Sequence, residues 1–295
     1  INPTIRLVIS PNINQTHSNN STISSSKSWN DKEEAINESA AKSNRETDNL
    51  VLGNTINFNK TFSKKLRNLS FVYSNSYTSL DSEGLTLSKT VFFQNNRPNI
   101  DRNQNIFNNN NYDSNSMDIE FTEPITDSLR VRIGVDLDWI NEISNLKTYD
   151  FNLISQTYSD LNDLQTNYTN SSRNSIRPKV GFTFEKNKYS FNFNSSTSMM
   201  DYDNHSIYLK KDTELNKKYF LPYVNAQIRY KLDRSKYLTL KYDYDNKLPT
   251  PVQIIPVANL SNPLVTFIGN PELDPNSTHT GSLNFNNYNF RERSG

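Results

Sequence analysis

The chain has no cysteine, and only seven of its 295 residues are glycine. Without cysteine it has neither disulfide bridges nor thiolate metal ligands, and no glycine-rich phosphate-binding loop is found. No run of about 18 apolar residues occurs, which excludes a membrane-spanning helix. The net charge is only +1, which gives no electrostatic footprint for nucleic acid. We therefore expect no cofactor, no metal and no nucleic-acid partner.

The overall polarity is high, with a mean hydropathy of −0.78 and 34% hydrophobic residues. Such polarity is typical of disorder, but 16 Phe and 16 Tyr are too many for a solvated coil. A polar chain can still fold if its strands are apolar on one face only and its interior is wet, as in a transmembrane β-barrel.

Residues 176–197 show this one-sided pattern most clearly. Ile176, Val180 and Phe182 alternate with polar or small residues, and after a polar turn at 185–188 the alternation resumes from Tyr189 to Phe193. Side chains on a strand point alternately to opposite faces, so the segment is predicted to be a hairpin with one apolar and one polar face.

The same alternation predicts about ten strands, most of about 9–11 residues, the length that crosses a bilayer when tilted. They lie at Ile5–Ile13, Leu50–Phe58, Leu69–Tyr77, Met117–Phe121, Leu129–Trp139, Ile176–Glu185, Tyr189–Thr197, Phe220–Leu232, Leu238–Tyr244 and Thr278–Tyr288. Short connections are expected near 60–67, 123–128, 185–188 and 233–236, and long ones near 14–48, 80–111, 144–172, 203–217 and 247–276. Residues 31–41 carry an acidic first turn that is compatible with a short helix inside a loop.

This rhythm predicts an all-β fold, an antiparallel up-and-down transmembrane β-barrel with long extracellular loops, whose apolar strand faces meet outer-membrane lipid. The alternatives are a soluble β-sandwich with long insertions and a repetitive surface protein. Loops of about 30 residues are unusual in compact soluble domains, and no fixed-period repeat is found.

The region from Leu248 to Tyr288 carries a more specific signal. Asn262-Pro263-Leu264 is followed by Gly269-Asn270-Pro271-Glu272-Leu273-Asp274-Pro275. This resembles the "NP-L … GNP-L-P" segment in the barrels of TonB-dependent receptors and their outer-membrane relatives, especially from Bacteroidota. The motif residues are Asn262, Pro263, Gly269, Asn270, Pro271, Leu273 and Pro275, and their prolines and glycine are typical of a rigid loop.

The resemblance implies a location in the bacterial outer membrane and the binding and import of a nutrient. It also implies a barrel of about 22 strands, of which residues 1–295 are a partial barrel domain. The plug domain and TonB-contacting box of that family are not found here, and the chain starts without an initiator methionine or signal sequence. We therefore expect a mature form or an excised fragment. The implied partners are an inner-membrane TonB-type energising protein, acting through a plug outside this chain, and a surface-exposed substrate-binding protein.

Two other function classes stay open. One is a structural outer-membrane barrel, or a subunit of a surface assembly, that transports nothing itself. The other is an enzyme active at the rim, for which Asp201, Asp203 and His205 would be the residues; we expect no enzyme, since all three histidines are expected in loops or at a loop–strand junction. Carboxylates two residues apart, such as Asp243 and Asp245, share a face of a strand, but they alternate with tyrosines as lumen-facing residues do, so no metal site is expected.

A ligand would be held by the loops, where aromatic and arginine side chains give large contact areas. The candidate residues are Trp29, Phe92, Phe93, Arg97, Arg102, Tyr149 and Tyr158.

Overall fold

One large antiparallel sheet makes up most of the protein. The computed structural model describes residues 4–94, 97–233, 235–255, 258–262 and 265–287. The sheet has 11 strands in the order β1-β2-β3-β4-β5-β7-β8-β9-β10-β13, and β6 pairs with β5 outside this path. The strands are β1 (Thr4–Trp29), β2 (Ala35–Thr61), β3 (Asn68–Phe92), β4 (Ile100–Pro124), β5 (Leu129–Asn152), β6 (Thr157–Leu161), β7 (Asn167–Lys186), β8 (Tyr189–Tyr208), β9 (Lys211–Lys231), β10 (Lys236–Lys247) and β13 (Asn276–Asn287).

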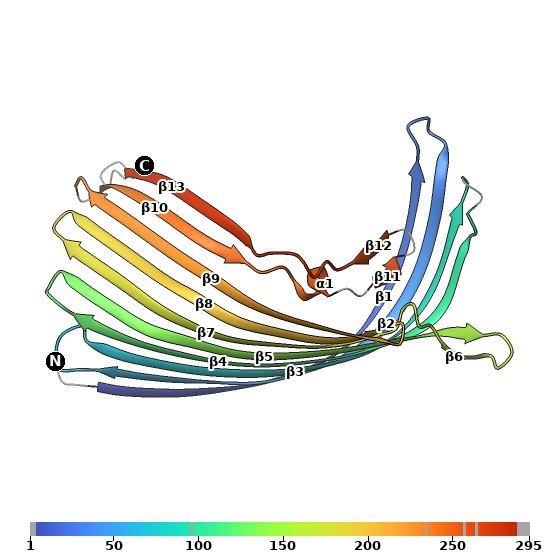
Figure 1. The fold of residues 1–295 in the computed structure, drawn as a ribbon, viewed down its shortest axis with the longest axis horizontal. Helices are drawn as coiled ribbons and strands as arrows, with labels where there is room; N and C mark the ends of the chain where they lie inside the picture. Colours follow the sequence, from blue (N-terminus) through green and yellow to red (C-terminus); the bar gives the residue numbers. More distant parts are fainter. Residues whose placement is uncertain (1–3, 95–96, 234, 256–257, 263–264, 288–295) are drawn as a thin grey trace.

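The sheet is a curved, open wall rather than a flat layer (Figure 1). Nearly every strand pairs with its sequence neighbours, which is the up-and-down order predicted from the sequence. Between β10 and β13 the chain forms the helix α1 (Pro251–Ile254) and a small hairpin, β11 (Ala258–Asn262) with β12 (Val265–Ile268). This connection lies on the hollow side of the wall (Figure 1). Within the described residues, β1 and β13 each have one strand neighbour, so both edges of the sheet are open.

All ten predicted strands are present, the last of them as far as Asn287, since Tyr288 lies outside the described residues. The four short connections are confirmed as turns at one end of the sheet. The prediction of long connections was wrong in four of five cases. The stretches 14–48, 80–111, 144–172 and 203–217 are mostly strand, because β1 to β5 and β7 to β9 continue well past their apolar segments, and the short β6 adds to the third stretch. In these extensions both faces are mostly polar, so the regular alternation of hydropathy disappears while the backbone pairing continues.

The short helix compatible with residues 31–41 is also not formed, since β2 begins at Ala35. The preceding residues form a tight turn in which the Asn30 side-chain oxygen accepts hydrogen bonds from the backbone N–H groups of Lys32 and Glu34, both at 2.9 Å. Glu33 takes a positive φ of 61° in this turn. The polar, acidic segment that suggested a first helical turn therefore closes a hairpin instead.

The apolar band crosses the sheet diagonally. On β1 the band ends at Ile13. Following the paired residues from strand to strand, the row through Ile13 reaches the polar Asn141 on β5. On β5 the band has already ended at Trp139. The row through Trp139 meets Asp201 on β8, where the band has already ended at Met199. A band that shifts steadily from strand to strand is what tilted strands show when they cross a layer of fixed thickness.

No described element covers this apolar face. Ile9 is 58% exposed, Ile133 57% and Phe220 69%, whereas only Tyr202 and the pair Ile254–Ile255 are buried hydrophobic residues among those described. A β-sandwich would bury such a face against a second sheet, so the soluble alternative does not describe this protein. No helix among the described residues is long and apolar enough to cross a membrane.

Candidate functional site

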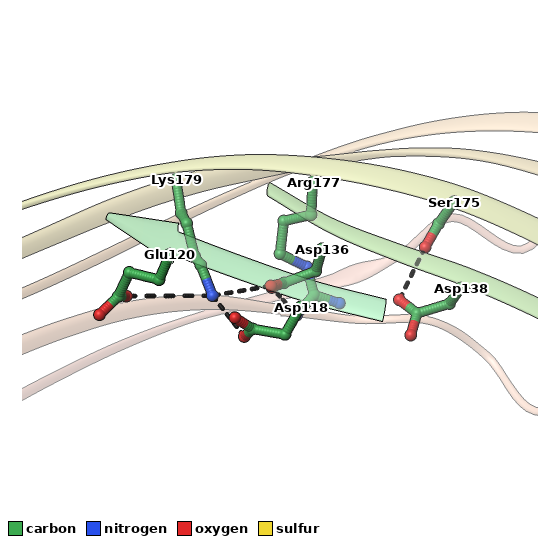
Figure 2. A network of polar contacts seen from close by, with 7 residues as sticks. All are labelled: Asp118, Glu120, Asp136, Asp138, Ser175, Arg177 and Lys179. Atoms are coloured by element: carbon green, nitrogen blue, oxygen red, sulfur yellow. Dashed lines mark hydrogen bonds and ion pairs between the residues drawn. The ribbon is translucent and has the colours of Figure 1, made fainter. Parts of the chain in front are cut away.

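The polar face of the wall carries a cluster of charged residues at the level of the apolar band. Lys179 on β7 reaches across β5 to β4, where its Nζ lies 2.5 Å from an Asp118 oxygen, and it also lies 2.7 Å from Asp136 on β5. Glu120 is 4.0 Å away, and Arg177 is 3.7 Å from the second oxygen of Asp136. Figure 2 shows the lysine amino group at the centre of this network, which we call the Lys179 cluster.

A glycine makes this crossing possible. Lys179 is paired with Gly134, which is paired with Glu120, so the lysine stem passes directly over Gly134. A Cβ added at Gly134 would lie 2.6 Å from Lys179 Cε and 2.5 Å from the Ile119 carbonyl oxygen. Glycine in a strand interior often marks such a close approach.

A second polar network follows one row of the same face. The Arg132 guanidinium donates to the Asn194 side-chain oxygen, Asn194 donates to Asn225 at 3.3 Å, and Asn225 donates to Asp243. The row therefore links a cation on β5 to a carboxylate on β10 through two amides. The prediction that Asp243 lies on the polar face, away from Tyr242, agrees with this contact.

Next to the Lys179 cluster is a hollow of about 430 Å³. Its lining includes Asp136, Arg177, Ser198 and Tyr223. Ser198 is 5% exposed, and its hydroxyl has no hydrogen-bond partner among the described residues. The Nε atom of Arg132, outside this hollow, also has no hydrogen-bond partner among them. Buried polar atoms without partners are uncommon, so this part of the wall has capacity for further polar contacts.

The connection between β10 and β13 packs onto the polar face above this level. Ile254, the last residue of α1, and Ile255 after it lie against Tyr202 on β8. Leu215 and Tyr219 of β9 pack beside them. Burial raises the pKa of Tyr202 above its ordinary value. This apolar contact is the one hydrophobic core of the described residues, and it holds the connection inward.

The motif in this connection is held by hydrogen bonds within the connection and by one hydrogen bond to the wall. The backbone N–H of Asn270 donates to the Gln253 carbonyl at 2.6 Å, and its side chain accepts from the Glu272 N–H at 2.9 Å. Lys217 of β9 donates to the Leu273 carbonyl at 3.3 Å. Gly269 is buried, Asn262 ends β11 and Pro263 lies outside the described residues. Pro271 and Pro275 flank the turn, so these contacts support the rigid-loop interpretation.

The structure separates the seven predicted ligand residues into several places. Most of them lie on strands rather than in loops, namely Trp29, Phe92, Arg102, Tyr149 and Tyr158, while Phe93 and Arg97 lie in the β3–β4 connection. The Arg97 guanidinium lies 4.7 Å from the Phe92 ring, and Tyr149 and Tyr158 line one pocket. Trp29 is at the tip of β1, and burial lowers the pKa of Arg102 on β4. Their role in binding stays a prediction.

Two of the three histidines lie well inside strands, where this expectation was wrong, whereas His279 lies near the start of β13, close to the expected loop–strand junction. His17 is on β1, His205 on β8 and His279 on β13. His205 lies 3.3 Å from Asp212 on the next strand, whereas Asp201 lies 3.5 Å from Lys218. Asp201 and His205 of β8 therefore have separate partners on β9. Among the described residues, no group of three or more His, Asp or Glu side chains is placed to hold a metal ion.

The Lys179 cluster could not be identified from the sequence, because Lys179 and Asp118 come together only through the register of three strands. A partial signal was present in the charged residues that alternate with the apolar ones on β5, interrupted by Gly134.

Comparison with known proteins decides the family. The profile of the outer membrane protein beta-barrel family matches residues 60–292. The chain belongs to the outer membrane protein beta-barrel family. As a member of this family it is located in the bacterial outer membrane. Its apolar band therefore meets lipid, its polar face lines the lumen, and the strand extensions stand on the extracellular side.

No curated protein matches this family member in sequence. Among solved structures, the ferric citrate transporter FecA in its unliganded form is similar at 10% identity, with a TM-score of 0.40. The match covers 82% of this chain and 44% of the FecA chain, so this chain spans less than half the length of that protein.

Proposed function

We propose that this barrel wall belongs to an outer-membrane importer of the TonB-dependent receptor type, which binds a nutrient and carries it through the lumen. The observation that carries the proposal is the lumen wall at membrane level. This wall carries the Lys179 cluster, the row of linked amides and a hollow lined by the unpartnered Ser198 hydroxyl. A merely structural barrel needs no such arrangement.

The remaining parts of the proposal come from the motif of the β10–β13 connection, which resembles that receptor family. An importer of this type takes its energy from an inner-membrane TonB-type protein acting through a plug, and some receive their ligand from a surface-exposed binding protein. The plug and both partners would lie outside this chain. The wall networks then present fixed polar partners to whatever fills the lumen, a plug or a passing ligand.

The test uses the whole native protein in its own bacterium. Cells lacking the gene are compared with wild-type cells for uptake of labelled nutrients, before and after the inner-membrane proton gradient is collapsed. The proposal predicts a nutrient whose uptake requires both the protein and the gradient. Uptake that persists without the gradient would indicate a passive channel, and no uptake defect for any nutrient would indicate a structural barrel; either result would overturn the proposal.

A pair of variants links the test to the wall. The charge-neutral change Lys179→Met with Asp136→Asn removes the centre of the Lys179 cluster and should reduce uptake. The matched control, Lys218→Met with Asp201→Asn, removes an exposed ion pair of 3.5 Å from the opposite face, and uptake should stay normal. Both variants must reach wild-type abundance in the outer membrane.

A further inference from the structure

A second hollow lies on the other face of the wall, just above the apolar band. It has a volume of about 800 Å³, within the usual range for small-molecule sites, and it spans β2 to β6. Its residue Asp81 is on β3, on the same face as Tyr77, where the aromatic part of the band ends. The hollow is therefore on the outside of the barrel, on its extracellular part, and not in the lumen. We call it the acidic pocket.

Four carboxylates form one side of the acidic pocket in an unfavourable arrangement. Asp48 is directly opposite Asp81, and Glu46 is directly opposite Glu83. All four line the pocket and are exposed. Like charges directly opposite each other on neighbouring strands destabilise a sheet, so the fold tolerates two such pairs side by side.

The described cations do not balance these carboxylates. His17 on β1 lies 2.9 Å from Asp48 and 3.6 Å from Glu46, and the hydrogen bond with Asp48 raises the pKa of His17 above its ordinary value. Lys147 on β5 also lines the pocket. In the sheet, Phe107 on β4 lies between Lys147 and Glu83. The four carboxylates thus leave a net negative site even with His17 protonated.

The opposite side of the pocket is aromatic. Phe107 and Tyr149 meet edge to face, with ring centroids 5.9 Å apart and planes at 82°. Tyr158 of β6 is held in place by its hydroxyl, which donates to Asn103 at 2.8 Å, and by an edge-on contact with Phe151 at 5.2 Å. These rings are pre-positioned, so an apolar or aromatic body could stack on them with little loss of side-chain entropy.

An unpartnered acceptor lies between the two sides. Asn105 lines the pocket and is only 8% exposed. Its side-chain N–H donates to Glu83 at 2.7 Å, but its carbonyl oxygen has no hydrogen-bond partner among the described residues. A buried acceptor beside carboxylates lacks a donor, and an ammonium or guanidinium group supplies several.

We propose that the acidic pocket binds a small organic cation, an ammonium or guanidinium group carried on an apolar or aromatic body. The charged group lies between the paired carboxylates and donates to them and to Asn105, while the body packs against Phe107, Tyr149 and Tyr158. The carboxylates do not gather as a set of metal ligands within the described residues, which favours an organic cation over a metal ion. The site lies outside the lumen, so it does not depend on the transport proposal.

The test is calorimetric titration of the purified full-length protein in lipid nanodiscs with tyramine, which carries an ammonium group on a phenol ring. Tyrosol, in which a hydroxyl replaces the ammonium, is the matched neutral probe. We expect saturable, one-site binding of tyramine that weakens as salt is added, and at least about tenfold weaker binding of tyrosol, since hydrogen bonds to charged groups carry the contact.

Variants assign the binding to the pocket. Glu46→Gln with Glu83→Gln keeps shape and removes charge, and it should weaken tyramine binding at least about tenfold. Tyr149→Leu should also weaken it, because the ring contact is lost. Glu38→Gln, a carboxylate near the tip of β2 that pairs with Lys27 at 3.7 Å, is the control and should bind as wild type.

Three results would overturn the proposal: no binding of tyramine, equal binding of tyrosol, or wild-type affinity in the glutamine double variant. Unchanged heat-modifiable mobility in gels shows that each variant is folded. Nutrient uptake should be normal in the same variants, so failure here and failure of the transport proposal are distinguishable.

Discussion

Lys179→Met should destabilise the barrel through the Lys179 cluster. The variant keeps the stem that crosses Gly134 but leaves three carboxylates around the position of the lost charge. At 2.7 Å, one ion pair is worth about 1.5 kcal/mol in bulk water and about 6 kcal/mol at an effective dielectric constant of 20. The Lys179 and Asp136 side chains are 21% and 20% exposed and face the lumen, so solvent screening and desolvation reduce these values. We expect a net loss of about 1–3 kcal/mol.

The measurement is urea unfolding of the full-length protein in lipid vesicles, followed by tryptophan fluorescence at low and high salt. A double-mutant cycle of Lys179→Met and Asp136→Asn isolates their interaction, and the double variant should be more stable than the sum of the single losses predicts. Lys218→Met, which breaks an exposed pair on the other face, should cost less than about 0.5 kcal/mol. A coupling below about 0.3 kcal/mol in the cycle would mean that the two charges act independently and that the reasoning is wrong.

Three further outcomes are expected. Gly134→Ala should lower the free energy of unfolding by about 1–3 kcal/mol, because the new methyl group meets Lys179 and a carbonyl oxygen, whereas Gly281→Ala, with nothing within 4 Å, should cost little in the same vesicle assay. Glu123, whose hydrogen bonds to an arginine and a lysine lower its pKa to about 2, should stabilise the fold above the ordinary carboxyl pKa of about 4.3 and lose this contribution as the pH falls toward 2. Comparing Glu123→Gln with wild type across that range checks the sign, and an equal acid response in both would contradict it. Ile254→Ser should undock the β10–β13 connection, so limited proteolysis should cut this connection faster while the unfolding midpoint of the sheet stays unchanged; equal cutting rates would contradict the docking.

The strands could be predicted because lipid imposes a pattern on them. Where one face meets hydrocarbon and the other water, as from Leu129 to Trp139, alternation follows directly from the geometry of a strand. Each predicted strand therefore coincides with the part of a real strand that crosses the membrane. The extensions carry no such pattern, since residues such as those from His17 to Ser28 have water on both faces. Their strand structure depends on backbone pairing between neighbouring strands rich in serine, threonine and asparagine, and the periodicity of hydropathy does not reveal this pairing.

The site was less predictable for a different reason. Lys179 and Asp118 are far apart in the sequence and two strands apart in the sheet, so their contact requires the register of β4, β5 and β7 together. The acidic pocket has the same origin, because Asp48 and Asp81 become neighbours only when β2 and β3 are aligned. Tyr149 and Tyr158 were selected as aromatic contact residues, and the structure places both in that pocket, but the carboxylates beside them gave no signal in the sequence.

The strand extensions also set the distance between the tips of the wall and the membrane surface. From Trp139, at the end of the apolar band, β5 continues to Asn152. At about 3.3 Å per residue and a tilt of about 40°, this raises its tip about 30 Å above the hydrocarbon layer. The Debye length at physiological salt is about 8 Å, so the membrane's surface charge is screened at the tips. Encounters of charged ligands with the tips should therefore depend on the protein's own side chains, whereas the acidic pocket, lower on the wall, lies closer to the potential of the lipid head groups.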